Sequence, residues 1–152
     1  MTTYIIQQAS SRDAGLVAPL FNEYRKFYGQ KDNIRICFDF LISRLESDES
    51  IIFYAFDESK KICCGFVQLY PSFSSVKAKR ILILNDLFTD LKYRSQGIAK
   101  ALIQSSHNYA KAHEFGKISL EASIDNHNAQ KLYNNMGYKI DNSFLTFVKN
   151  RF

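Results

Sequence analysis

Residues 94–99 read Arg94-Ser95-Gln96-Gly97-Ile98-Ala99, and they lie between a strand-like run at 81–89 and a helix-like run at 98–112. The first N–H groups of a helix have no partner within the helix, and the helix dipole adds partial positive charge there. Gly97 lacks a Cβ, so a phosphate can approach its backbone closely, and Arg94 adds a full positive charge. The stretch therefore predicts a pyrophosphate-binding turn at a helix start, with an ordinary helix start as the alternative of equal weight.

Period-two and helical patterns on either side of this turn predict the element order β α α β β β α β α β β. This order describes a mixed α/β domain with a largely antiparallel sheet and a βαβ unit in its second half. The turn then lies at the carboxyl end of the first strand of that unit, where ligands of open α/β sheets bind. The expected strands span residues 4–8, 51–56, 63–70, 81–89, 118–124, 138–140 and 144–148, and the expected helices span 17–28, 34–45, 98–112 and 129–136.

Three local signals refine this path. Asp32 is expected to open the second helix, because Asp is a good N-cap residue. Residues 71–75 are expected to form a loop, and Gly137 is expected to end the last helix.

Composition bounds the class of protein. The chain has 152 residues, which fits one domain with a sizeable core. It has 13 Phe, 9 Tyr and only 2 Pro, which favours a folded protein over a disordered one. The net charge of +5 is spread out, and its densest group, Lys77, Lys79 and Arg80, is better explained by a solvated loop than by a nucleic-acid patch. A positive balance would also attract an anionic cofactor.

The cysteines and the N-terminus indicate the compartment. Adjacent Cys63 and Cys64 would point to opposite faces of a strand, and with Cys37 their number is odd, so neither a disulfide framework nor a Cys-rich metal site is expected. The histidines also lack metal-ligand spacing with one another. The N-terminus lacks the segments of a signal peptide, and no apolar run reaches the roughly 18 residues of a membrane span. We therefore expect a cytoplasmic protein with no metal and no membrane or nucleic-acid partner.

A second motif, Asn126-x-x-Ala129-x-x-Leu132-Tyr133-x-x-x-Gly137-Tyr138, follows the turn. Together with Arg94-x-x-Gly97-x-Ala99 it resembles the GCN5-related N-acetyltransferases, whose element order fits nearly the whole chain. Residues 68–75 and 84–89 are similar to the small branch of diamine acetyltransferases and Hpa2-like histone acetyltransferases. The resemblance implies one domain over residues 1–152 that moves an acetyl group from acetyl-CoA to a primary amine by direct transfer in a ternary complex.

The resemblance also implies which residues bind acetyl-CoA. The N–H groups of Arg94, Ser95, Gln96, Gly97, Ile98 and Ala99 would hold the pyrophosphate. Leu87, Phe88 and Thr89 match the segment that pairs with the pantetheine arm like an added strand, and a main-chain N–H there would polarise the thioester carbonyl. Asn126 matches the side chain that reaches the pantetheine, and Tyr133 matches the tyrosine near the thioester sulfur.

The reaction needs a base and an acid. An amine attacks only when neutral, whereas a free alkylamine has a pKa of about 10, so a base must take its proton. Asp86 and Glu121 are candidates for the base, and either could instead be hydrogen-bonded or surface-exposed. Tyr133 is the candidate acid for the departing thiolate, with core packing of its ring as the alternative. Asn85 stands where the diamine branch tends to carry Glu, which favours a water relay.

The acceptor is expected to be a small polyamine-like amine or a lysine of a basic peptide or protein. The candidate carboxylates for a polyamine are Glu23, Asp32, Asp86 and Glu121, and Tyr24, Tyr28 and Tyr70 could line the pocket beside Asn85. The branch also tends to form homodimers, often through C-terminal strands. The main rival function is a non-catalytic acyl-CoA-binding or sensor module, and a nucleic-acid-binding domain, suggested by the charge, is a weaker one.

Overall fold

Five strands form one sheet in the order β1-β2-β3-β4-β5 in the computed structural model, which describes residues 3–152. The first four strands pair antiparallel, and β5 pairs parallel with β4. The strands are β1 (Tyr4–Gln8), β2 (Ile51–Asp57), β3 (Ile62–Ser74), β4 (Lys79–Thr89) and β5 (Ile118–Leu120). The helices are α1 (Ala14–Phe27), α2 (Ile34–Glu46), α3 (Ile98–Ala112) and α4 (His127–Asn135), with short 3-10 turns at Ser11–Asp13 and Leu91–Tyr93. This confirms the mixed α/β class and the βαβ unit.

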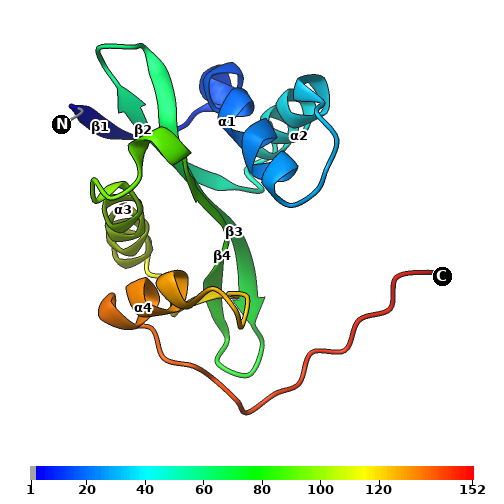
Figure 1. Ribbon diagram of the computed structural model, residues 1–152. Coiled ribbons are helices and arrows are strands. Elements are labelled where there is room, and N and C mark those ends of the chain that lie inside the picture. The colour runs from blue at the N-terminus through cyan, green and yellow to red at the C-terminus, as the bar shows by residue number, and fades with distance from the viewer. Residues whose placement is uncertain (1–2) are drawn as a thin grey trace. The chain divides into compact units, whose positions relative to one another are not determined.

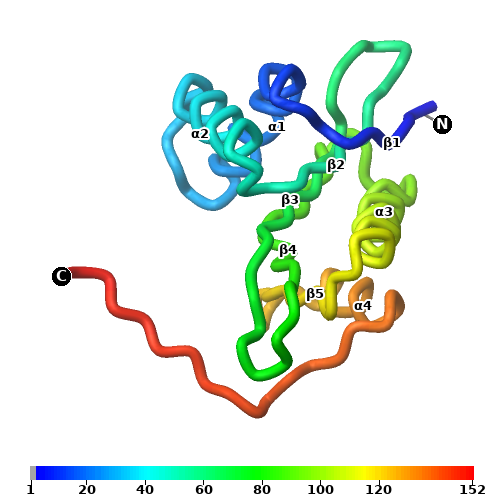
Figure 2. Tube along the Cα trace, turned by 180° about the vertical axis from the view of Figure 1, so that it is seen from behind, coloured from blue at the N-terminus to red at the C-terminus, as the bar shows by residue number. Residues whose placement is uncertain are grey.

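The chain divides into two units, one ending at Glu121 and the other spanning Ala122–Phe152. In the first unit, α1 and α2 cover one face of the sheet and α3 covers the other (Figures 1 and 2). Gly65 on β3 permits the close approach of α3, because a Cβ there would lie 2.6 Å from Cγ2 of Ile98. On the opposite face, Phe66 of β3 and Phe88 of β4 join the core beneath α1 and α2. The expected single domain over 1–152 stays a prediction.

A β-bulge at Asn85 decides which way the end of β4 faces. Leu84 pairs with Leu69, but the next partner of β3, Gln68, pairs with Asp86, so Asn85 is an extra residue. The side chains of Leu69 and Gln68 point to opposite faces of the sheet, and a residue paired across two strands points to the same face as its partner. Leu84 therefore shares the α3 face with Leu69, whereas Asp86 turns to the α1–α2 face. Without the bulge, simple alternation along β4 would have placed Leu84 and Asp86 on the same face.

The same bulge explains why β5 is short. The sequence pattern predicts a strand over 118–124, whereas the pairing with β4 covers only Ile118–Leu120 opposite Leu82–Leu84. The parallel ladder stops where Asn85 interrupts the regular spacing of backbone groups in β4.

Two local expectations in the first unit are wrong. Asn33, not Asp32, caps α2, since its side chain accepts a hydrogen bond from the N–H of Ile36, while Asp32 accepts one from Asn22 at 2.7 Å. Residues 71–74 continue β3 and do not form a loop. Pro71 is tolerated there because the pairing with β2 ends at Leu69, so the missing N–H of proline faces no neighbouring strand on that side.

The second unit contains α4 followed by Gly137, whose φ of +93° ends the helix as expected. The expected strands at 138–140 and 144–148 are wrong for this chain, because residues 137–152 form neither helix nor strand. A strand needs an edge with which to share its backbone hydrogen bonds, and no pairing includes these residues. The apolar side chains there are exposed, with Phe144 at 85% and Phe147 at 90%.

All three cysteines are buried free thiols. Burial raises the pKa of Cys63 to about 12 and that of Cys64 to about 11. Among the helices of residues 3–152, none is long and apolar enough to cross a membrane.

Candidate active site

Asp86 is the buried acidic residue at the centre of the site. Only 6% of its surface is exposed, and three side chains donate hydrogen bonds to its carboxylate. The Tyr24 hydroxyl donates to Oδ1 at 2.8 Å, Asn85 Nδ2 donates to the same oxygen at 3.1 Å, and Gln68 Nε2 donates to Oδ2 at 2.8 Å. The bulge thus turns the Asp86 carboxylate to the α1–α2 face of the sheet. There, donors from α1, β3 and β4 fix its orientation.

Tyr24 and Gln68 are themselves constrained by this arrangement. Burial, followed by the nearby negative charge of Asp86, raises the pKa of Tyr24 well above its usual value, so its hydroxyl stays protonated and acts as a donor. Gln68 is completely buried, and among the described residues its Oε1 atom has no hydrogen-bond partner. This unused acceptor leaves Gln68 able to reverse its amide if the group opposite changes from acceptor to donor.

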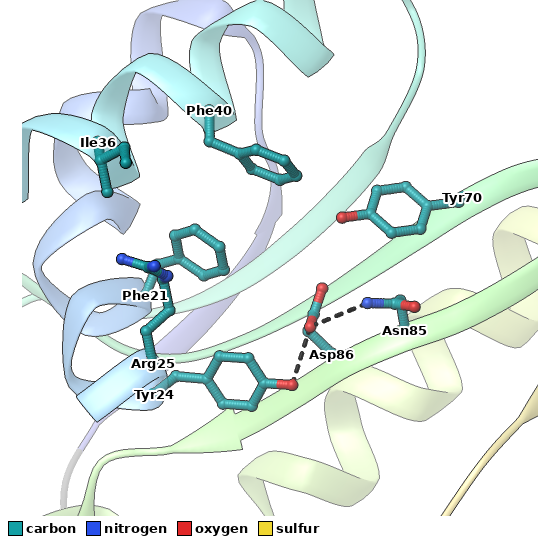
Figure 3. A pocket seen from close by; sticks show the side chains of 8 residues that line it. All are labelled: Phe21, Tyr24, Arg25, Ile36, Phe40, Tyr70, Asn85 and Asp86. Carbon is teal, nitrogen blue, oxygen red and sulfur yellow. Dashed lines mark hydrogen bonds between the residues drawn. The ribbon is translucent and has the colours of Figure 1, made fainter. Parts of the chain in front are cut away.

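An open cavity of about 350 Å³ gives access to Asp86. Its size is within the range of small-molecule sites, and half of its lining residues are aromatic. Figure 3 shows Asn85 and Asp86 at one end and Arg25 at the other, with Phe40 and Tyr70 above them. The lining residues are Phe21, Tyr24, Arg25, Ile36, Phe40, Tyr70, Asn85 and Asp86. Burial, and then Asp86, raise the pKa of Tyr70 to about 12.

The end of β4 offers a backbone edge beside this carboxylate. β5 pairs only as far as Leu84, so within residues 3–152 no strand pairs with the far edge of β4 from Asp86 to Thr89. The opposite edge of Leu87, Phe88 and Thr89 is held by β3. Apart from the carbonyl of Thr89, which accepts a hydrogen bond from Arg94, the N–H and C=O groups on this outer edge can pair with an extended ligand as they would with a neighbouring strand.

Residues 94–99, which the sequence predicts to bind pyrophosphate and which we call the anion turn, lie between β4 and α3. Ser95 and Gly97 both adopt left-handed backbone conformations, with φ of +64° and +79°, and such turns collect N–H groups around a concave site. Gly97 caps α3, so the first N–H groups of that helix, from Ile98 and Ala99, are free for an anion. Among residues 3–152, a Cβ on Gly97 would meet only Tyr4 Oη, at 3.9 Å, so no other described atom lies close above it.

Hydrogen bonds connect the turn to β4 and β1. Arg94 Nε donates to the carbonyl of Thr89 at 3.3 Å, and its guanidinium lies over the Phe88 ring. Tyr4 donates to the carbonyl of Gln96 at 3.4 Å.

A buried contact fixes the start of the turn. Tyr93 directly precedes Arg94, and its hydroxyl donates to Asp57 at 2.7 Å. The hydrogen bond from Tyr93, together with those from the hydroxyl and N–H of Ser59 and the N–H of Lys60, lowers the pKa of Asp57 to about 2. The same contact, with burial, raises the pKa of Tyr93 to about 12. An ionised Asp57 on the β2–β3 hairpin therefore anchors the entry to the anion turn.

The structure does not bring every expected residue to the cavity. Glu121 is exposed, just past the end of β5, and Tyr28 is 64% exposed with its ring against Tyr24. Neither lines the cavity. Of the other carboxylates expected for a polyamine, Asp32 binds Asn22 and Glu23 pairs with Lys26 on the surface of α1.

Asn126 and Tyr133 lie in the second unit. Asn126 caps α4 by accepting a hydrogen bond from the N–H of Ala129 at 3.1 Å. Tyr133 is half-buried, and its ring meets that of Tyr138 edge to face at 6.0 Å. Their roles toward acetyl-CoA stay predictions.

Sequence reasoning missed five of the contributors: Gln68, Phe21, Arg25, Ile36 and Phe40. A buried glutamine inside an apolar strand was the one signal that could have found Gln68, because such a side chain needs a polar partner. Arg25 and Phe40 reach the site only through the packing of α1 and α2, and no local sequence pattern predicts that packing.

Comparisons with known proteins agree with this geometry. The sequence model of the Acetyltransferase (GNAT) family matches residues 17–138. An uncharacterized N-acetyltransferase of Bacillus subtilis, YhfO, is 41% identical over 95% of this chain and 96% of its own length. The crystal structure of a probable acetyltransferase superposes with a TM-score of 0.90 at 36% identity, covering 97% of each chain.

The finer branch has less support. The D-amino-acid N-acetyltransferase HPA3 of Saccharomyces cerevisiae is 30% identical over 57% of this chain and 54% of its own length, so similarity to the Hpa2-like branch is weak. The assignment to the family rests on the match over residues 17–138, which contains both expected motifs, at 94–99 and at 126–138. This chain is a member of the GNAT family and an N-acetyltransferase.

Proposed function

We propose that the protein transfers the acetyl group of acetyl-CoA directly to a primary amine in a ternary complex. The observation that carries this proposal is the position of Asp86: a buried carboxylate, open to a cavity, on the strand whose free edge and following turn can hold the donor. The pyrophosphate binds the N–H groups of 94–99, and the pantetheine pairs with Leu87–Thr89. A main-chain N–H of this edge polarises the thioester carbonyl.

Asp86 is the proposed acceptor of the amine proton, directly or through one water. Its three donors hold one orientation, and Asn85 beside it can position the water. Glu121 is the less favoured candidate because it lies outside the cavity. Tyr133 is the proposed acid that protonates the CoA thiolate, and Asn126 the proposed pantetheine contact, both supported by the motif that they share with the family.

Two wider features are also proposals. The exposed apolar side chains at Phe144, Leu145 and Phe147 support a homodimer in which a second copy covers them, and sedimentation of a monomer at micromolar concentration would contradict it. The three free thiols support a reducing cytoplasmic location, which fractionation of cells that express the protein checks.

The test of the proposed function measures acetyl-CoA binding and CoA release in the same preparations. Gly97→Val should weaken acetyl-CoA binding by about tenfold or more, because it strains the turn at φ +79° and adds a side chain where phosphate approaches. Gly29→Val is the matched control, since Gly29 has a similar φ of +84° outside the turn and no atom of the described residues lies within 4 Å of its Cβ position.

Equal acetyl-CoA affinity in folded wild type and Gly97→Val would contradict the placement of the donor. Tight binding of acetyl-CoA with no turnover of any amine would favour the acyl-CoA sensor instead.

A further inference from the structure

The charges around the cavity do not suit a polycation. Asp86 is the only carboxylate among its lining residues, and it is already bonded to three donors. A polyamine or a lysine-rich peptide needs further acidic groups for its other cations. The carboxylates of Glu23, Asp32 and Glu121 do not line the cavity. The cavity therefore selects an acceptor with a single cationic centre.

Arg25 adds a positive charge to the same cavity. Its guanidinium Nη1 lies 3.8 Å from Cys37 Sγ, a long and weak contact, and no ion pair of residues 3–152 includes Arg25. Arg25 is partly buried, at the end of the cavity opposite Asp86 (Figure 3). Two arginines of α2, Arg35 and Arg44, each have an acidic partner instead. A guanidinium that lines a cavity without an acidic partner is suited to a carboxylate, which it can bind with two parallel hydrogen bonds.

Between these two charges the walls are apolar. The rings of Phe21 and Phe40 stack at 5.9 Å, and Tyr24 meets Phe66 and Phe88 behind them. Ile36 and Tyr70 complete the lining. Such walls favour a ligand whose middle is aromatic or aliphatic.

We infer that the acceptor is an amine that bears a carboxylate at the far end of an apolar body, that is, an aromatic or aliphatic ω-amino acid or a close analogue. Its amine lies toward Asp86 and Asn85, its apolar part lies against Phe21 and Phe40, and Arg25 binds its carboxylate. Arg25 is thus the specificity-determining residue. This inference rests on the proposed function, because it names the acceptor of that same acetyl transfer.

Matched acceptors test the inference with the wild-type enzyme. Phenylalanine, as both enantiomers, is compared with 2-phenylethylamine and phenylalaninamide, whose amines are respectively more and less basic. 4-(Aminomethyl)benzoate, whose carboxylate lies farther from its amine than that of phenylalanine, is compared with benzylamine. Spermidine and a lysine peptide complete the set. At least one carboxylate-bearing acceptor should exceed its partners in kcat/KM by about ten- to one-hundred-fold, the range of a charge-assisted hydrogen-bonded pair.

Variants then locate the effect. Arg25→Gln should remove the preference by lowering kcat/KM for the carboxylate-bearing acceptor while sparing its uncharged partner, and Arg25→Glu should reverse the preference. Lys26→Gln is the control, because Lys26 is the neighbouring cation of α1 but does not line the cavity. It should leave both values within about twofold of wild type, the scale of a surface substitution.

The outcomes separate the two proposals. If amines are acetylated but spermidine or the uncharged partners are preferred, or if Arg25→Gln lowers both members of a pair equally, the inference is wrong and the acetyltransferase stands. If no acceptor of the set releases CoA from bound acetyl-CoA, the proposed function is wrong as well.

Discussion

Asp86 is the residue through which the proposed proton transfer can be tested most directly. Asp86→Asn removes the charge and keeps the shape, and the fold should survive because Gln68 can turn its amide so that Oε1 accepts from the new Nδ2. We expect kcat/KM to fall by about 10²–10⁴-fold, the usual contribution of a positioned base, with acetyl-CoA affinity unchanged.

The comparison variants are Glu121→Gln and Asp39→Asn, both exposed outside the cavity. Steady-state kinetics from pH 6 to 10 decide the role. A loss confined to the KM of the amine would assign Asp86 to attraction of the substrate, and a larger loss in Glu121→Gln would move the base to that residue.

Tyr133 is tested by removing one oxygen. Tyr133→Phe keeps the ring that meets Tyr138, so folding and acetyl-CoA binding should be retained. If its hydroxyl protonates the thiolate, kcat should fall by about 10²–10⁴-fold. A fall of less than about threefold in rapid-quench or steady-state assays, well below that range, would make Tyr133 a packing residue.

At the scale of elements, the β2–β3 hairpin should control the anion turn through Asp57. Its folded-state pKa of about 2 lies below the ordinary value of 3.8, so its charge stabilises the fold above about pH 4, and that contribution is lost as the pH falls toward 2. Asp57→Asn should therefore be less stable than wild type at pH 7, and the difference in melting temperature should shrink between pH 4 and pH 2.

The same variant should raise the KM for acetyl-CoA more than it lowers kcat, because Tyr93 would lose the acceptor that holds the start of the turn. A stability difference that does not change with pH would show that the carboxylate charge is not what matters.

Elements with strong local signals could be predicted, and those decided by distant pairing could not. The pattern over 98–112 predicted α3 with its observed bounds, because helical periodicity is local. The direction of Asp86 depends on one extra residue at Asn85, which shifts the register against β3. The short β5 and the absent strands after Gly137 depend on whether a partner edge exists, which the sequence of a strand does not contain.

At the scale of the whole molecule, one part of the candidate site could be predicted from the sequence and another part could not. The turn at 94–99 and the carboxylate of Asp86 could be named from sequence, since a motif and a polar interruption of an apolar strand mark them. The cavity could not, because its walls come from α1, α2, β3 and β4 and meet only in the packed structure. The positive end of the cavity, Arg25, is a property of that packing.

The burial of every cysteine sulfur means that the folded protein should not react with thiol reagents, whereas the proposed transfer from acetyl-CoA releases the thiol of CoA. A chromogenic aromatic disulfide should therefore count turnovers in real time with no background from the catalyst. In denaturant the same dye should register all three thiols of each chain. Rapid colour from the folded protein alone would show that one of the three comes to the surface.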